Sequence, residues 1–206
     1  MTQTVATTRR LPMIPRALAA WGDLRGAMRA ELAERPGDGR LLGYLIVALL
    51  INWASAIPLN IKAAGGDASD VIGMGFVANV FMAPLLFYAL AALLLWCGRV
   101  FGGKAGFYEH RLALFWGFLV ATPVVVLANA AQNLLGGVVI IPITSDLINA
   151  ITSDQLIGFA KGLLTLFVLG TCMAETNGAK PLWRGVGQVL LPSAVVITVS
   201  AMVRLL

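Results

Sequence analysis

FMAPLLFYALAALLLWC, residues 81–97, decides the fold, because it is a long run of apolar side chains without a single charged residue. It is the most apolar part of a segment that extends over about residues 72–97. An α-helix rises about 1.5 Å per residue and the hydrocarbon core of a bilayer is about 30 Å thick, so about 20 apolar residues cross it. This segment therefore predicts a transmembrane helix.

Further segments of similar character lie on both sides of this one. The chain is 59% hydrophobic and 12% charged, whereas soluble domains carry about 25% charged residues. The additional spans are predicted at residues 41–59, 112–131, 156–174 and 186–203. We therefore expect an all-α integral membrane protein, with a cytoplasmic arm over residues 1–39 and a five-span transmembrane domain over residues 40–206. No cleaved leader is expected, because the first residues lack the compact apolar core of a signal peptide.

Residues 134–154, LLGGVVIIPITSDLINAITSD, separate the third and fourth predicted spans. Their apolar runs are short and are interrupted by Gly136-Gly137, Pro142 and Asp146. An irregular strand cannot cross lipid, because its backbone hydrogen-bonding groups would lack partners. We expect an interfacial or re-entrant segment, and the sequence leaves both readings open.

The positions of the basic residues predict the orientation. Twelve of the fifteen Lys and Arg residues lie before the first span or in the second and fourth connections, and the other three are Lys62, Lys161 and Arg204. Because basic residues favour the cytoplasmic side, the N-terminus is expected in the cytoplasm and the C-terminus on the outer side, which for a cell inner membrane is the periplasm. The cationic side would meet membrane lipids with anionic headgroups, and no nucleic acid is needed to explain the net charge of +5.

The arm before the first span has the pattern of an amphipathic interfacial helix. Its apolar residues recur at helical spacing, at Ile14, Leu18, Trp21, Leu24, Met28 and Leu32. Arg16, Asp23 and Glu34 fall on the opposite side of this helix, and Pro36-Gly37 is expected to end it. Such a helix orients a protein on the membrane surface, and recognition of a cytoplasmic partner is the alternative.

Several polar and small residues inside the spans are candidates for helix–helix packing. Asn52 and Asn79 would be costly facing lipid, so they are expected to face other helices. Gly158 and Gly162 form a G-x-x-x-G pair that lets two helices approach closely, either within the chain or between two copies. Lys161 is expected about one turn from the outer end of its span, where its ammonium group reaches the outer surface.

Few residues suit catalysis or cofactor binding. His110 is the only histidine, and a metal or catalytic site needs several converging groups. Gly102-Gly103-Lys104 lacks the spacing of a phosphate-binding P-loop. No catalytic residue, metal or cofactor is therefore predicted, and Glu109, His110 and Glu175 are the only candidates for an intramembrane enzyme.

Two stretches together resemble the Yip1-domain family. Residues 101–123, FGGKAGFYEHRLALFWGFLVATP, are similar to the family's Gly-Gly-Lys turn and the helix that follows it. Residues 169–192, LGTCMAETNGAKPLWRGVGQVLLP, are similar to its closing pattern, in which a short Asn-Gly turn joins the fourth span to the fifth. The short arm resembles that of the compact bacterial members. The resemblance implies five spans and no catalytic residues, and the sequence leaves open whether the eukaryotic members' link to small GTPases applies to this chain.

The expected function is that of a non-enzymatic, polytopic membrane protein that organises membranes or associates with another membrane protein, including a second copy of itself. A small transporter or channel is the alternative, because Pro58, Pro84, Pro123 and Pro192 are expected to bend four of the spans.

Overall fold

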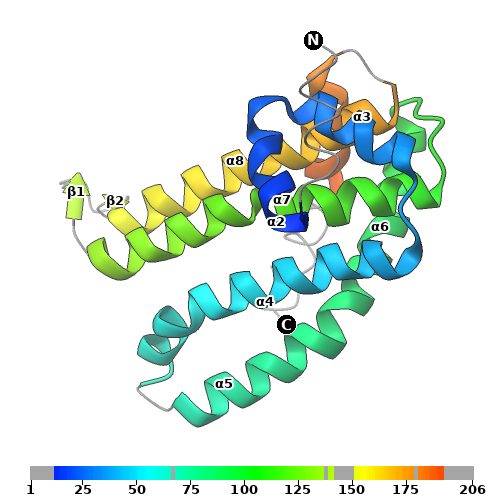
Figure 1. Ribbon diagram of the computed structural model, residues 1–206. Coiled ribbons are helices and arrows are strands. Elements are labelled where there is room, and N and C mark those ends of the chain that lie inside the picture. Colours follow the sequence, from blue (N-terminus) through cyan, green and yellow to red (C-terminus); the bar gives the residue numbers. More distant parts are fainter. Residues whose placement is uncertain (1–11, 66–67, 137–138, 142–150, 179–180, 193–206) are drawn as a thin grey trace, which may run out of the picture.

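The computed structural model describes residues 12–65, 68–136, 139–141, 151–178 and 181–192. These residues are almost entirely helical, as the composition predicts (Figure 1). Among the described residues, four helices are long and apolar enough to cross a membrane: α4 (Asp38–Ala63), a continuous helix over Ala68–Val100, α7 (Phe107–Leu135) and α8 (Ser153–Thr176). The shortest of them has 24 residues, which corresponds to about 36 Å. Each contains one of the first four predicted spans and extends beyond it at both ends.

Helix α7 is the centre of the molecule. In its most apolar window 61% is buried, compared with 22–28% for the other three long helices. It packs most extensively against α8 on one side and α4 on the other. Its buried aromatic residues, Phe115 and Trp116, contact Tyr88 and Tyr44 from the neighbouring helices.

The second long helix contains a π-helical turn. It begins as α5 (Ala68–Val77), continues through the π turn η2 (Ala78–Met82) and ends as α6 (Ala83–Val100). The π turn ends two residues before Pro84, which has no N–H to donate to the preceding turn. Helix α5 buries none of its side chains, and it contacts α4 through an edge-to-face pair between Trp53 and Phe76.

The arm forms two helices where the sequence predicts one. Helix α2 (Met13–Ala19) runs into a short 3-10 turn η1 (Ala20–Gly22), and α3 (Leu24–Glu34) then starts in a new direction. Asp23 caps α3, because its carboxylate accepts a hydrogen bond from the Gly26 backbone N–H at 2.8 Å. Arg35 adopts a left-handed conformation and ends α3 directly before Pro36, as expected from the Pro-Gly pair.

The described parts of residues 134–154 include a short antiparallel pair of strands, β1 (Val139–Ile141) and β2 (Ile151–Thr152). This pair lies where α7 ends and α8 begins, far from the arm (Figure 1). We call this end of the molecule the strand end and the opposite one the arm end. Residues 142–150 lie outside the described residues, so the interfacial and re-entrant readings both stay predictions.

The fifth predicted span is described only in its first part. Residues 182–192 are helical, and this helix packs against α8 at the arm end. The remainder of the predicted span, residues 193–203, lies outside the described residues.

Candidate functional site

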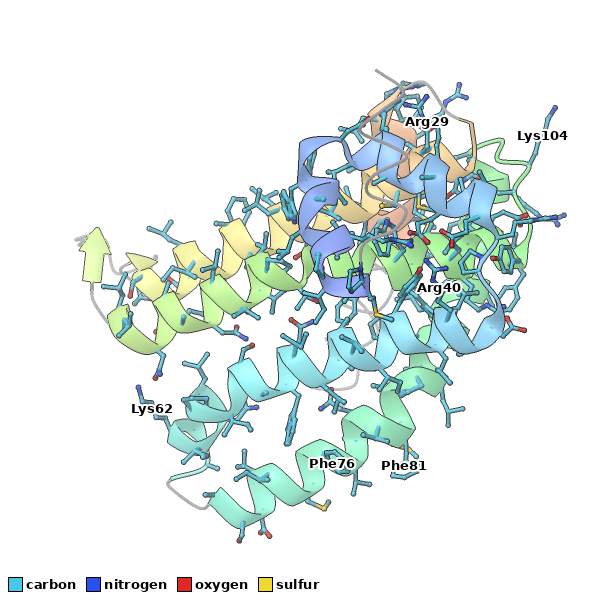
Figure 2. The ribbon with its side chains drawn as sticks, viewed as in Figure 1. Arg29, Arg40, Lys62, Phe76, Phe81 and Lys104 are labelled. Atoms are coloured by element: carbon cyan, nitrogen blue, oxygen red, sulfur yellow. The ribbon has the colours of Figure 1, made fainter. Side chains whose placement is uncertain are left out.

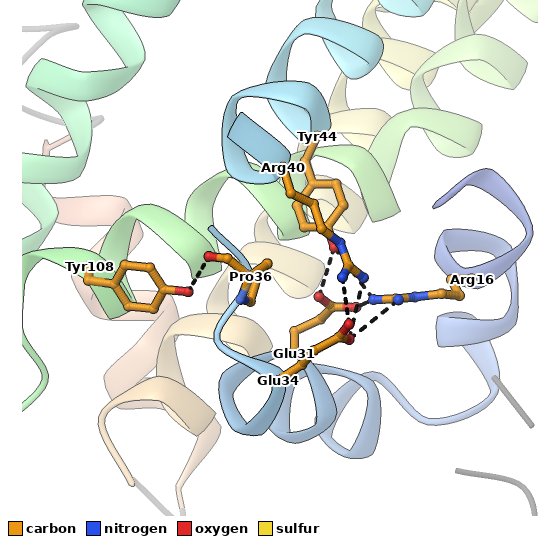
Figure 3. A network of polar contacts seen from close by, with 7 residues as sticks. All are labelled: Arg16, Glu31, Glu34, Pro36, Arg40, Tyr44 and Tyr108. Atoms are coloured by element: carbon orange, nitrogen blue, oxygen red, sulfur yellow. Dashed lines mark hydrogen bonds and ion pairs between the residues drawn. The ribbon is translucent and has the colours of Figure 1, made fainter. Parts of the chain in front are cut away.

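A network of polar contacts joins the arm to α4 (Figure 3). The guanidinium of Arg16 forms an ion pair with Glu31, and the two side chains are only 8% and 3% exposed. Tyr44 Oη of α4 donates a hydrogen bond to Glu31 Oε2 at 2.9 Å. Arg40 Nη1 donates to Glu34 Oε1 at 2.5 Å. Charges from both arm helices are thus paired with each other and with the start of α4.

Arg16 lies on the side of α2 opposite to the apolar residues, as the helical spacing predicts, and this polar side faces the protein. Ile14, Leu18 and Trp21 form the predicted apolar stripe, but they are 49%, 53% and 37% exposed, while Arg16 is buried. The reason is that α3 folds back beside α2 and supplies the carboxylates that Arg16 needs, which turns the polar face of α2 inward. A helical-wheel argument for one continuous helix could not foresee this second helix.

The other three residues predicted for the apolar stripe, Leu24, Met28 and Leu32, lie on α3 and pack toward the protein core. Met28 is fully buried in the core, and Leu32 is partly buried against it. Trp21, at the end of α2, donates from Nε1 to the backbone carbonyl of Val120 in α7 at 3.0 Å. The arm therefore packs on the helical body and presents Leu18 and its neighbours outward.

Ion pairs also connect α3 to the ends of α7 and α8. Arg29 Nε lies 3.4 Å from Glu175 Oε1, and Arg25 Nη1 lies 3.9 Å from Oε2 of the same carboxylate. Arg35 Nη2 lies 3.4 Å from Glu109 Oε1. Two of the three groups considered for catalysis, Glu109 and Glu175, therefore have structural partners on the arm.

The short segment between α3 and α4 also contacts the start of α7. Tyr108 Oη donates a hydrogen bond to the Pro36 carbonyl at 2.8 Å (Figure 3). Arg111 forms an ion pair with Asp38 at the first turn of α4. The arm thus meets three of the long helices at once.

A pocket of about 310 Å³ opens at the arm end, between the α6–α7 connection and the turn that follows α8. Its lining comes from the end of α6, the glycine-rich turn, the end of α8 and the helix over residues 182–192: Gly98, Phe101, Gly102, Gly103, Lys104, Met173, Ala174, Asn177, Gly178, Arg184, Gly185 and Gln188. Gly102 (φ +77°) and Gly178 (φ +64°) close the two turns in the left-handed region that favours glycine.

Buried polar side chains form the floor of this pocket. Gln188 Nε2 donates to the Leu94 carbonyl at 2.7 Å, and Gln188 Oε1 accepts from Asn177 Nδ2 at 2.9 Å. His110, the third group considered for catalysis, is buried beside them, with its Nδ1 2.9 Å from the Gly106 carbonyl and its Nε2 3.5 Å from Asn177 Nδ2. This places the only histidine within a network of amides.

A second polar chain crosses the helices nearer the strand end. Lys161 Nζ of α8 donates to Asn129 Oδ1 of α7 at 3.3 Å, and Asn129 Nδ2 donates to Ser55 Oγ of α4 at 2.8 Å. Helix α8 begins at Ser153, so Lys161 lies about 12 Å along it, more than two turns from its start. Nothing in the sequence indicates this contact with Asn129, and the position of Lys161 relative to the outer membrane surface stays a prediction.

The two predicted packing asparagines differ in their partners. Asn52 Nδ2 donates to Thr122 Oγ1 of α7 at 3.4 Å, which is the expected contact between helices. Asn79 Nδ2 instead donates to the carbonyl of Gly75, one turn earlier in its own helix, at 2.8 Å.

Within the described part of the chain, the close helix approach involves other glycines than Gly158 and Gly162, and packing of that pair between two copies stays a prediction. A Cβ added to Gly162 would meet nothing within 4 Å among the described residues, and one added to Gly158 would meet only the end of the Gln132 side chain. A Cβ added to Gly185 would overlap the carbonyl oxygen of Gly170 and the backbone of Ala174. Gly170 and Ala174 are also four residues apart, as in a small-x-x-x-small pair. The sequence contains more than one such pair on α8, and it does not show which face of α8 meets another helix.

The pocket was not predicted, although its residues lie almost entirely in the two stretches that carry the family resemblance. Residues 101–104 belong to the first stretch, and residues 173–188 of the lining belong to the second. The sequence alone does not show that these two turns meet in space. Their similarity to one family's motifs was the signal that could have suggested it.

No group of three or more His, Cys, Asp or Glu side chains in the described part of the chain is arranged to hold a metal ion. Comparisons with protein-family models, curated proteins and solved structures found no match, so the resemblance to Yip1-domain proteins rests on the sequence motifs.

Proposed function

We propose that this chain is a non-enzymatic, multi-pass protein of the bacterial inner membrane, of Yip1 type, that associates with lipids and with another membrane protein through its arm. In this proposal five helices cross the bilayer, the N-terminus and the arm end face the cytoplasm, and the strand end faces the periplasm. The four long apolar helices support multiple membrane crossings, and the charge distribution supports the orientation.

The side chains at the two ends fit this orientation. Arg29, Arg40 and Lys104 lie at the arm end and Lys62 at the strand end, and Phe76 and Phe81 lie on the helix that runs between the two ends (Figure 2). Trp96 and Trp183, each 62% exposed, lie beside basic residues near the arm end. Exposed tryptophans beside basic residues are typical of the membrane–water interface.

The observation that carries the proposal is the orientation of the arm. A surface helix of a soluble protein turns its charged face to water, whereas Arg16 is buried and Leu18 and Trp21 are exposed. In lipid this arrangement is favourable, because apolar groups lie outside and ionic groups find partners inside. The burial of Met28 in the core and the hydrogen bond from Trp21 to Val120 hold the arm on the helical body, so Ile14, Leu18 and Trp21 form a fixed surface available to acyl chains or to an apolar partner.

Purification in mild detergent tests the association. We expect a partner, or a second copy of the chain, to co-purify in fixed proportion with the wild type and to be lost in Leu18→Ala. Leu85→Ala is the matched control, since Leu85 is 66% exposed on α6 and the same atoms are removed. A solitary monomer, or equal loss of the partner in both variants, would refute association through the arm.

The alternative of a small transporter is favoured by one observation, the hydrogen-bonded chain from Lys161 through Asn129 to Ser55. An ionisable group at this depth marks a solute or ion route in many membrane proteins. Flux of a solute or ion into proteoliposomes that is abolished by Lys161→Met would favour this alternative. The absence of flux in the wild-type protein agrees with the association proposed above.

A further inference from the structure

The buried amide network at the arm end attaches one helix to two others. Gln188, on the helix over residues 182–192, donates to a backbone carbonyl of α6 and accepts from Asn177 at the end of α8. Gln188 and His110 are both almost completely buried, with 2% and 1% of their surface exposed. A Cβ at Gly98 of α6 would overlap the Nε2 atoms of both side chains, so they meet at this glycine. The attachment of the helix therefore depends on side chains that surround a histidine.

The hydrogen bonds of this network have one possible direction. The network ends at the carbonyl oxygens of Leu94 and Met173, which can only accept. The amide nitrogens of Gln188 and Asn177 therefore point toward these carbonyls, and Asn177 Nδ2 also donates to Gln188 Oε1. The same nitrogen of Asn177 lies 3.5 Å from His110 Nε2. Because this ring nitrogen faces a donor, it has to be an acceptor.

The other ring nitrogen determines the tautomer of His110. Nδ1 lies 2.9 Å from the carbonyl oxygen of Gly106, one turn earlier in the chain, so Nδ1 carries the hydrogen and Nε2 the lone pair. A second proton, on Nε2, would point at the amide nitrogen of Asn177. That amide cannot turn over without losing its bonds to Met173 and Gln188. The network therefore fits a neutral imidazole and has no acceptor for a charged one.

No carboxylate of the described residues forms an ion pair with His110. Glu109, its neighbour in α7, accepts from the Gly106 N–H and pairs with Arg35 of the arm. A buried charge without a partner is costly, so the surroundings oppose protonation of the ring. The other charged groups on the elements around it are cations or are already paired: Arg99 at the end of α6, Lys104 and Arg184 at the rim of the pocket, and Glu175 of α8, which pairs with Arg25 and Arg29.

We propose that His110 and the amides around it form a pH-sensitive latch, which holds the helix over residues 182–192 against α6 and α8 while the imidazole is neutral and releases it when the imidazole is protonated. An exposed imidazole takes up a proton near pH 6.5, whereas the latched ring has no acceptor for it. The latched state is therefore favoured above pH 6.5 and loses this advantage as the pH falls below that value. Control by the cytoplasmic pH rests on the orientation proposed above, whereas the latch itself does not.

Linkage gives the size of the expected effect. If only the released state takes up the proton, its population relative to the latched state rises about tenfold between pH 7.5 and pH 5.5. Hydrogen exchange of the full chain in mild detergent, corrected for the direct effect of pH on exchange, measures this population. We expect the backbone amides of residues 182–192 to exchange about tenfold faster at the lower pH, and those of residues 41–50 in α4 to be unchanged.

Three variants test the role of the histidine. His110→Gln keeps a donor and an acceptor but takes up no proton, so exchange of residues 182–192 should no longer depend on pH. Gly98→Ala should make these amides exchange fast at both pH values, because its Cβ separates Gln188 from His110. Gly73→Ala is the matched control, since a Cβ there meets nothing within 4 Å among the described residues, and it should keep the pH dependence of the wild type.

NMR of 15N-labelled histidine in the wild type decides the proposal even if His110→Gln does not fold. His110 is the only histidine, so one imidazole spectrum identifies its tautomer. We expect the Nδ1–H tautomer at pH 7.5, and a doubly protonated ring over the same pH range in which residues 182–192 exchange faster. An Nε2–H tautomer at pH 7.5, protonation without faster exchange, or an equal pH response in His110→Gln would overturn the latch.

Discussion

Replacement of Arg16 by methionine removes the cation from the most buried ion pair in the described part of the chain. The Glu31 side chain, 3% exposed, would then keep only the hydroxyl of Tyr44 as a described partner. Loss of one member of a buried pair costs about 3–5 kcal/mol, because the remaining charge stays buried without compensation. For a protein of this size that corresponds to a decrease in Tm of roughly 6–20 °C.

A thiol-reactive dye measures this change in mild detergent. Cys97 and Cys172 are both free and buried, so they react only as the protein unfolds. Arg29→Met is the control, because Arg29 pairs with Glu175 but its side chain is 64% exposed. An exposed pair contributes about 0–1 kcal/mol, so the Tm of this variant should fall by less than about 4 °C.

The double variant Arg16→Met with Glu31→Leu tests whether the cost of Arg16→Met comes from the unpaired Glu31 carboxylate. Removal of both charges leaves no buried ion, so we expect it to recover most of the stability that Arg16→Met loses. Equal decreases in Tm for Arg16→Met and Arg29→Met, or a double variant no more stable than Arg16→Met, would refute the reasoning that a buried ion pair fixes the arm.

Two other predictions concern packing and topology. Gly185→Ala should lose about 1–3 kcal/mol of stability in the same assay, because its Cβ overlaps the Gly170 carbonyl, whereas Gly162→Ala should leave the Tm unchanged or slightly raised. Equal Tm values for the two variants would contradict the assigned helix contact. Cysteines introduced at Ala64 and Lys104, both exposed, should differ in labelling by an impermeant maleimide. Ala64→Cys should react in intact spheroplasts and Lys104→Cys only after lysis, and the reverse pattern would overturn the proposed orientation.

The long helices could be predicted from the sequence because their cause is local. A run such as residues 81–97 has too little charge for any aqueous surface, whatever it packs against. The helix boundaries extend beyond the apolar runs, since residues such as Asp38 and Thr176 are helical but polar. Hydropathy measures where lipid contact is favourable, and it does not measure where backbone hydrogen bonding ends.

The polar contacts could not be predicted in the same way, because each depends on two distant segments. Arg16 has its carboxylate partners in the next helix, and Lys161 finds Asn129 across a helix interface. The pocket requires that the turns at Gly102 and Asn177 meet. Residue type and spacing indicated which side chains are costly to leave unpaired, but the pairing itself comes from the tertiary structure.

The π turn at Ala78–Met82 has a consequence for the length of this helix. Such a turn holds one more residue than an α-helical turn, and each residue rotates the helix by about 100°. Deletion of one residue there would restore a regular α-helix and rotate Phe76 away from Trp53. The centroids of these two rings are 5.8 Å apart. Substitutions along α5 are therefore easier for the molecule to accommodate than a change in the number of residues between Gly75 and Pro84.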